Sequence, residues 1–432
     1  MGNILSSNNE NQFLNPVDLD FNKSLFWIIT LTIFSGAIRK WVFTTGSMGN
    51  ILLLIQLFLP FLISLKKLGF SLPSKLYIFK FYFLYLLISA FNPLNLTIFH
   101  GILGIILHLG FWWLIFFYYE NRQLIDIRPL IPWMVTLCVI EFIIGIVQYQ
   151  LPADSFLNKY AAIDQLGVNQ SVAMVGNSVR ITGTFSYISG YTSFLIFAIL
   201  FIWSLFYTAY NKRVIVFLLL GVIITTLMSG SRTSTLIVIL IILLIIISEF
   251  TLETISDFIK SMIVPFLILF IFFSAKLSSG GGDIIKNAFS NFETRRIENS
   301  QTGEQNQRIK SDIQELFMDY RGKYPFFGVG LGSTYQGATS IFGTSEYVFE
   351  YGYYEGELPR IVLEAGFILL IFRVLLFAWL FSWLEINILS KFVCFIIFGY
   401  ATGIIFNIYS SIFLALGLIF LDNTALRKKI WK

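Results

Sequence analysis

Long apolar runs separated by short polar segments fill most of the chain after residue 24. Each run is close to the length that an α-helix needs to cross roughly 30 Å of hydrocarbon. The pattern predicts membrane-spanning helices at about residues 25–43, 48–65, 76–91, 98–119, 130–149, 190–210, 214–230, 233–249, 260–276 and 362–383. The last run, 392–421, forms one long helix or two short ones with a break near Asn407–Ser411. We therefore expect an all-α polytopic membrane protein with about eleven or twelve spans.

Composition also indicates that lipid surrounds most of the chain. Hydrophobic residues make up 56% of the 432 residues and charged residues only 13%, which excludes an ordinary soluble protein. The formal net charge of +5 would suggest a nucleic-acid partner in a soluble domain. Here the basic residues lie at helix ends, where lipid headgroups and insertion topology account for them. We expect membrane lipid around the chain and no nucleic acid.

The lysines and arginines between the apolar runs predict which helix ends face the cytoplasm. Basic residues follow the second, fourth and sixth predicted spans, at 66–75, 122–128 and 212–213, and such residues favour the cytoplasmic side. The basic C-terminus should also lie inside, which requires an even number of spans and favours twelve. Arg39 and Lys40 do not fit this rule, because they lie near the outer end of the first span.

These signals divide the chain into seven segments. The first apolar run lacks the basic start and cleavage site of a secretory signal, so we expect it to be retained. The expected segments are 1–24, a cytoplasmic tail; 25–149, spans one to five; 150–189, an outer loop; 190–276, spans six to nine; 277–358, a large outer loop; 359–421, spans ten and eleven or ten to twelve; and 422–432, a basic cytoplasmic tail.

The large outer loop is longer than a helix connection requires, and loops of that length are usually functional or disordered. Its first part, 278–306, is rich in Gly, Ser, Asn and Gln. Apolar residues from Ile309 to Tyr320 then recur at helical spacing and predict an amphipathic helix. We expect chemistry where this loop meets the outer ends of the spans.

Three arginines on the predicted outer face are candidates for binding an anion. Arg232 follows Gly230 at the start of a predicted helix, where unpaired N–H groups and a guanidinium fork suit a phosphate. Arg180, just before the sixth span, can reach the same place, and Arg308 lies on the predicted loop helix. The alternatives are an interfacial arginine that extends to water, for Arg232, and ordinary solvated arginines for the other two.

Two carboxylates are candidates for a general base. Glu355 and Glu357 lie two positions apart, close to Arg360, where the outer loop meets the tenth span. Burial at such a boundary would raise the pKa of a carboxyl group towards that of a useful base. The alternative is a hydrated acidic rim. The adjacent Tyr353 and Tyr354 offer stacking surface for sugar rings.

Charged residues inside the spans are a further class of candidates. Glu141 and Arg373 lie inside the fifth and tenth predicted spans, where an unpaired charge is costly, so each has a functional role or pairs with the other or with backbone groups. His100 and His108 are eight positions apart, which is the wrong spacing for a metal pair on one helix face. We expect no metal and no cofactor.

Six short motifs follow one another between about residues 140 and 420. They are Glu141 with Gly145 and Gln148-Tyr149, the segment 180–185, the segment 229–234, Arg308, the glycine-containing segment 325–332, and Glu364-Ala365-Gly366. Their order, spacing and topology resemble the O-antigen polymerase and O-antigen ligase superfamily of bacterial cell-envelope enzymes. The resemblance implies a fold similar to the C-type glycosyltransferases, in the bacterial inner membrane, with the active site facing the periplasm.

The resemblance also implies a metal-independent transfer of a glycan from undecaprenyl diphosphate. A sugar hydroxyl of one lipid-linked unit would attack the other unit, with the arginines near the diphosphate. A chain-length regulator protein is an expected partner.

Two other functions stay open. Ligases of the family, which transfer glycan to lipid A or another acceptor, carry a loop histidine about eleven residues before the glycine that matches Gly366. That position is Glu355 here and the loop has no histidine, which favours a polymerase. A transporter or flippase of lipid-linked sugars would be expected to show internally repeated, broken helices, and we find no repeat.

Overall fold

The computed structural model describes residues 16–43, five positions between 51 and 58, and residues 77–161, 172–175, 178–249, 325–347 and 356–430. Except for those five positions, the predicted span 48–65 lies outside the described residues. So do the whole of the predicted span 260–276 and the predicted amphipathic helix of the large outer loop.

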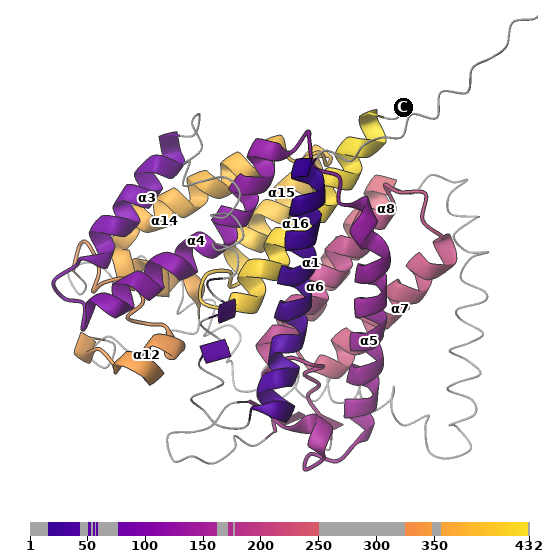
Figure 1. The fold of residues 1–432 in the computed structure, drawn as a ribbon, viewed down its shortest axis with the longest axis horizontal. Coiled ribbons are helices and arrows are strands. Elements are labelled where there is room, and N and C mark those ends of the chain that lie inside the picture. Colours follow the sequence, from indigo (N-terminus) through magenta and orange to yellow (C-terminus); the bar gives the residue numbers. More distant parts are fainter. Residues whose placement is uncertain are drawn as a thin grey trace, which may run out of the picture.

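The described chain is helical apart from loops and one two-stranded pairing (Figure 1). Its helices are α1 (Pro16–Ala37), η1 (Ile38–Val42), α3 (Tyr77–Ala90), α4 (Ile98–Asn121), η2 (Arg128–Leu130), α5 (Ile131–Gln150), η3 (Phe156–Asn158), α6 (Ile188–Leu205), α7 (Lys212–Ser229), α8 (Arg232–Glu249), α12 (Gln336–Phe342), α14 (Glu357–Trp383), α15 (Ile388–Ile396), η5 (Ile397–Ala401) and α16 (Ile408–Ile430). The antiparallel strands β1 (Met174–Val175) and β2 (Ser178–Val179) pair with each other.

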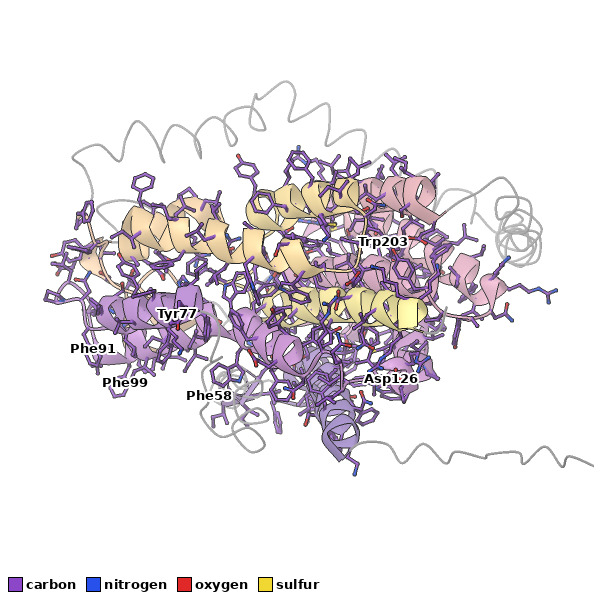
Figure 2. The ribbon with its side chains drawn as sticks, turned by 90° about the horizontal axis from the view of Figure 1, so that it is seen from above. Phe58, Tyr77, Phe91, Phe99, Asp126 and Trp203 are labelled. Atoms are coloured by element: carbon purple, nitrogen blue, oxygen red, sulfur yellow. The ribbon has the colours of Figure 1, made fainter. Side chains whose placement is uncertain are left out.

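Eight helices in the described part are long and apolar enough to cross a membrane. Their surfaces carry many large apolar side chains, which water would not favour. Tyr77, Phe91 and Phe99, for example, are more than half exposed, and Phe91 and Phe99 lie at an edge of the molecule (Figure 2), whereas Trp203 is fully buried. The chain is therefore a helical multi-pass membrane protein.

Most predicted spans have nearly the observed bounds. The ends of α4, α5, α7 and α8 lie within two residues of the prediction. Helix α6 ends at Leu205, earlier than predicted, and α14 begins at Glu357 rather than at 362. The earlier start places Glu357 inside the helix and not in the loop before it.

The run 392–421 is divided between two helices. The first, α15 with η5, ends at Ala401, and α16 begins at Ile408. Asn407 caps α16, because its Oδ1 accepts hydrogen bonds from the amides of Tyr409 (3.0 Å) and Ser410 (3.4 Å). Helix α16 then continues to Ile430, so the basic residues near the C-terminus lie in its last turns.

The core lies around α6 and α16, the most buried of the eight spans: 89% of the α6 window and all of the α16 window are inside the molecule. Phenylalanines from the two helices contact each other: Phe197 and Phe413 stack, with ring centroids 5.4 Å apart, and Phe201 and Phe420 meet edge to face at 5.3 Å. In Figure 1, α3, α4, α12 and α14 lie on one side of α16, and α1 and α5 to α8 on the other. The protein thus has two groups of helices joined at α16.

One end of the bundle carries a network of ion pairs. Arg122, just beyond α4, donates two hydrogen bonds of 2.7 Å to Asp422 in α16 and lies 3.5 Å from Glu385. Lys428 pairs with Glu249 at the end of α8 (3.8 Å). Burial opposes the charged form of Arg122, but the hydrogen bond and charge of Asp422 outweigh it and raise the pKa of the guanidinium.

Candidate functional site

Residues 180–186 form a buried turn that side chains from other helices hold in place. The Gln148 side chain, near the end of α5, accepts a hydrogen bond from the Gly183 amide with its Oε1 (2.8 Å) and donates one to the Gly183 carbonyl from its Nε2 (2.9 Å). Glu141 accepts the amide of Thr184 (3.1 Å). Gly183 is left-handed (φ 54°), and a Cβ there would lie 2.2 Å from Glu141 Oε2. Any residue larger than glycine would therefore disrupt this turn.

Arg39 and Lys40, which do not fit the positive-inside pattern, turn inward from the π-helix η1. Lys40 is only 2% exposed, and its Nζ donates to Thr182 Oγ1 (2.8 Å) and to the carbonyl of the following residue (3.0 Å). Arg39 Nη1 donates to Ser186 Oγ at 3.4 Å. Both basic residues thus bind the 180–186 segment. These contacts explain why two basic residues lie at a helix end where the positive-inside rule predicts few.

Replacing Lys40 by methionine should lower the free energy of unfolding by about 2 kcal/mol, because hydrogen bonds from a charged group contribute about 1.5–3 kcal/mol. Thermal unfolding in detergent micelles measures the change. The control is Lys212→Met, at an exposed position at the start of α7, which should stay within about 0.5 kcal/mol of the natural protein. An equal free energy of unfolding in the Lys40→Met and Lys212→Met variants would contradict this role of Lys40.

The turn between α7 and α8 joins two predicted anion-binding arginines. Gly230 closes α7 in the left-handed conformation (φ 62°), and Arg232 begins α8. Arg180 Nε donates to the carbonyl of Ser229, the last residue of α7, at 3.1 Å. Burial raises the pKa of the nearby Tyr160 to about 12, although the charge of Arg180 lowers it. Arg180 therefore reaches the turn that precedes Arg232.

The glycine-containing segment 325–334 packs against a kink in α14. The helix loses its regular geometry at Ala365 (φ −147°, ψ 23°) and Gly366 (φ 71°, ψ −178°). Two amides of the segment donate to the carbonyls of Leu363 (2.8 Å) and Glu364 (3.0 Å), immediately before the kink. The kink thus offers backbone acceptors to the segment and fixes it on α14.

Side chains of α14 bind the end of the same segment. The fully buried Glu364 accepts hydrogen bonds from the backbone amides of Gly332 (3.0 Å) and Thr334 (3.0 Å) and from the Thr334 hydroxyl (2.6 Å). Its carboxylate also lies 3.5 Å from His108 Nε2. Arg360 donates to Thr334 Oγ1 (3.1 Å) and to the Thr334 carbonyl (2.7 Å). The acid and the arginine therefore hold one threonine from two sides without pairing directly.

Both carboxylate oxygens of the predicted base Glu357 are already bound by other groups of the protein, one by an arginine and the other by backbone amides. Its Oε1 pairs with Arg373, and its Oε2 accepts the amides of Ile404 (2.5 Å), Ile405 (2.6 Å) and Phe406 (3.4 Å). The residue is 9% exposed. These contacts give Glu357 a structural role at the break between η5 and α16, and the hypothesis that it acts as a base does not fit them.

The other predicted site residues fall into two groups. Glu355, Tyr353, Tyr354 and Arg308 lie outside the described residues. Arg180 contacts the end of α7, Arg232 begins α8, and Arg360 lies at the start of α14. Of the alternatives for Glu141 and Arg373, pairing with each other is not what the structure shows: Glu141 accepts a backbone amide of the turn before α6, and Arg373 pairs with Glu357 within α14.

Sequence reasoning did not recognise Arg39 and Lys40 as site residues. The available signal was their disagreement with the positive-inside pattern, because a basic residue on the wrong side needs a local partner. In the part of the chain that the structure describes, no three His, Cys, Asp or Glu side chains gather as a metal site would require. No family model, curated protein or solved structure matches the chain.

Proposed function

We propose that this chain polymerises lipid-linked oligosaccharide repeat units of an O-antigen or of a capsular or exported polysaccharide. A glycan would pass from undecaprenyl diphosphate to a sugar hydroxyl of a second lipid-linked unit. The reaction would take place at the periplasmic face of the bacterial inner membrane, in a fold similar to the C-type glycosyltransferases. A chain-length regulator is the protein partner that this function implies.

The observation that carries the proposal is the meeting of Arg180 with the turn before Arg232. The Arg180 guanidinium donates to the last carbonyl of α7, and Arg232 begins the next helix. Two guanidinium groups and a helix N-terminus at one turn provide the donors and positive charge that a diphosphate requires. The buried 180–186 segment supports this geometry, since Lys40, Gln148 and Glu141 hold it rigidly.

The proposed reaction breaks the bond between the anomeric carbon and the diphosphate oxygen and forms a bond to the acceptor hydroxyl oxygen. Diphosphate is a good leaving group, so the fixed charge of Arg180 and Arg232, joined by Arg308, would stabilise the developing negative charge without a metal. The acceptor proton goes to a carboxylate. Because Glu357 is occupied, we assign this proton to Glu355.

Tyr353 and Tyr354, beside Glu355 in the sequence, would stack on the sugar rings. Arg360 belongs to the same substrate-binding region in this proposal.

Purified protein incubated with a defined lipid-linked repeat unit should produce a ladder of longer lipid-linked products. Arg180→Gln and Arg232→Gln should each lower the rate roughly a hundredfold, the loss expected when one preorganised donor to developing charge is removed. Glu355→Gln should lower it by a factor of about 100 to 10,000. Arg213→Gln, at the exposed start of α7, is the control and should keep the natural rate.

If Arg180→Gln and Arg232→Gln both produced the ladder of longer products at the natural rate, the proposed diphosphate site would be refuted. Products joined only to lipid A would indicate a ligase. Movement of a labelled unit across vesicles without a change in its length would indicate a transporter.

A further inference from the structure

Four aromatic side chains gather where the loop after α5 meets the ends of α1 and α6. The Trp41 ring of η1 stacks on the Phe156 ring of η3, with ring centroids 6.0 Å apart. Tyr160, later in the same loop, meets edge to face with Tyr187, the residue that caps the N-terminus of α6, at 5.3 Å. The amide that follows Tyr160 donates to the carbonyl that precedes Tyr187 (3.1 Å). Segments far apart in the sequence therefore form one aromatic surface.

Hydrogen bonds hold this surface in place. The buried Asn158 side chain donates to three backbone carbonyls at the end of α5 and just beyond it, at 2.9–3.2 Å. Trp41 Nε1 donates to the Phe156 carbonyl at 3.2 Å, which ties η1 to the loop. A ligand that stacks on these rings would therefore order few protein groups when it binds, and such preorganisation favours affinity.

Two of the four rings are open to a ligand, and charged groups surround them. Phe156 is 56% exposed and Tyr187 40% exposed, whereas Tyr160 beneath them is only 5% exposed. Asp154 and Lys159 are exposed on the same loop, and Lys159 Nζ lies 5.3 Å from the centre of the Phe156 ring. Charged side chains avoid hydrocarbon, so a lipid chain is a poor partner for this surface. A sugar ring, with an apolar face for the rings and hydroxyls for the charges, fits both features.

The aromatic surface is connected to the proposed diphosphate site through one residue. The Tyr160 hydroxyl accepts a hydrogen bond from the Ala173 amide (3.1 Å), and the Ala173 carbonyl accepts one from the Arg180 amide (3.0 Å). Arg180 in turn donates to the last carbonyl of α7. A sugar that is linked to a diphosphate at Arg180 would therefore lie near Tyr160 and the exposed ring of Tyr187.

We propose that Tyr187 and Phe156 bind the glycan of the lipid-linked donor, whose sugar rings stack on their exposed faces. This deepens the proposed function and rests on it in one respect: Arg180 holds the diphosphate from which the glycan extends. The proposal assigns the donor sugars to residues other than Tyr353 and Tyr354.

The test compares two probes: farnesyl diphosphate, a short polyprenyl diphosphate, and the same lipid carrying two β1,4-linked glucose units. Native mass spectrometry in detergent measures the dissociation constant of each. Tyr187→Ala and Phe156→Ala should each weaken binding of the glycosylated probe roughly threefold to tenfold, the loss expected for one aromatic contact, and leave farnesyl diphosphate unaffected. Tyr187→Phe retains the ring and should restore the affinity. The matched control is Tyr77→Ala, a 70% exposed tyrosine on α3, which should bind both probes as the natural protein does.

Thermal unfolding in detergent shows whether each variant folds, and Phe156→Ala, at the more exposed position, serves if Tyr187→Ala does not. Natural affinity of both alanine variants for the glycosylated probe would overturn the sugar site. An equal loss of affinity for both probes would also overturn it, because rings that contact lipid or only support the fold do not distinguish a sugar. Arg180→Gln should weaken both probes. If it weakens neither while the Tyr187 effect persists, the diphosphate site is refuted and the sugar site is supported, so the two proposals fail separately.

Discussion

Glu357→Gln is expected to lower the free energy of unfolding by about 3–5 kcal/mol, the cost of breaking a buried ion pair by removing one partner. Arg373, 3% exposed, would lose its only carboxylate among the described residues. It would keep a 3.4 Å hydrogen bond to the Phe398 carbonyl and a position over the Phe377 ring, 5.2 Å from the ring centre. The three amides before α16 would also lose a charged acceptor. Thermal unfolding in detergent micelles measures the change.

The double variant Glu357→Gln with Arg373→Met separates a structural role from a catalytic one. Removing both charges should restore most of the stability, since replacing a buried pair by apolar groups is often neutral or stabilising. If Glu357 is structural, polymer formation returns together with stability. A stable Glu357→Gln protein that makes no polymer would instead support the base hypothesis that the contacts of Glu357 argue against.

Gly366→Ala is expected to destabilise the protein by about 3 kcal/mol or more, because its backbone (φ 71°, ψ −178°) lies in a region that essentially only glycine adopts. A Cβ would also lie 2.2 Å from the Phe326 carbonyl oxygen. Relief of that clash would move the segment 325–334 away from α14. Thr334 would then separate from Arg360 and Glu364, so substrate-dependent activity should fall together with stability.

Gly399→Ala is the matched control for Gly366→Ala. A Cβ at Gly399 has no neighbour within 4 Å among the described residues, and Gly399 lies inside the π-helix η5 without a positive φ. The substitution should change the free energy of unfolding by less than about 1 kcal/mol. Comparable losses of stability in the two variants would show that the kink at Gly366 has no special importance.

Local sequence signals were sufficient for most helices. Apolar runs between polar segments predicted α4, α5, α7 and α8 to within two residues, because a lipid-facing helix must satisfy its own backbone and therefore needs a continuous run of the right length. Each of these features depends on neighbours along the chain or on the membrane itself.

Contacts between distant segments decided the rest. The break at 402–407 depends on Glu357, whose carboxylate accepts amides nearly fifty positions away, and no local pattern encodes that contact. In the sequence, Lys40 is only an exception to the positive-inside pattern, and the fold supplies its partner, Thr182.

The sequence by itself therefore determined a multi-pass helical membrane protein and the order of its helices, since hydrophobic length acts locally. Only the tertiary structure decided which charges form a structural ion pair, as with Glu357 and Arg373, and which basic residue is held by hydroxyl and carbonyl oxygens, as with Lys40. The physical reason is that a buried charge is defined by the groups packed around it, and these come from several helices.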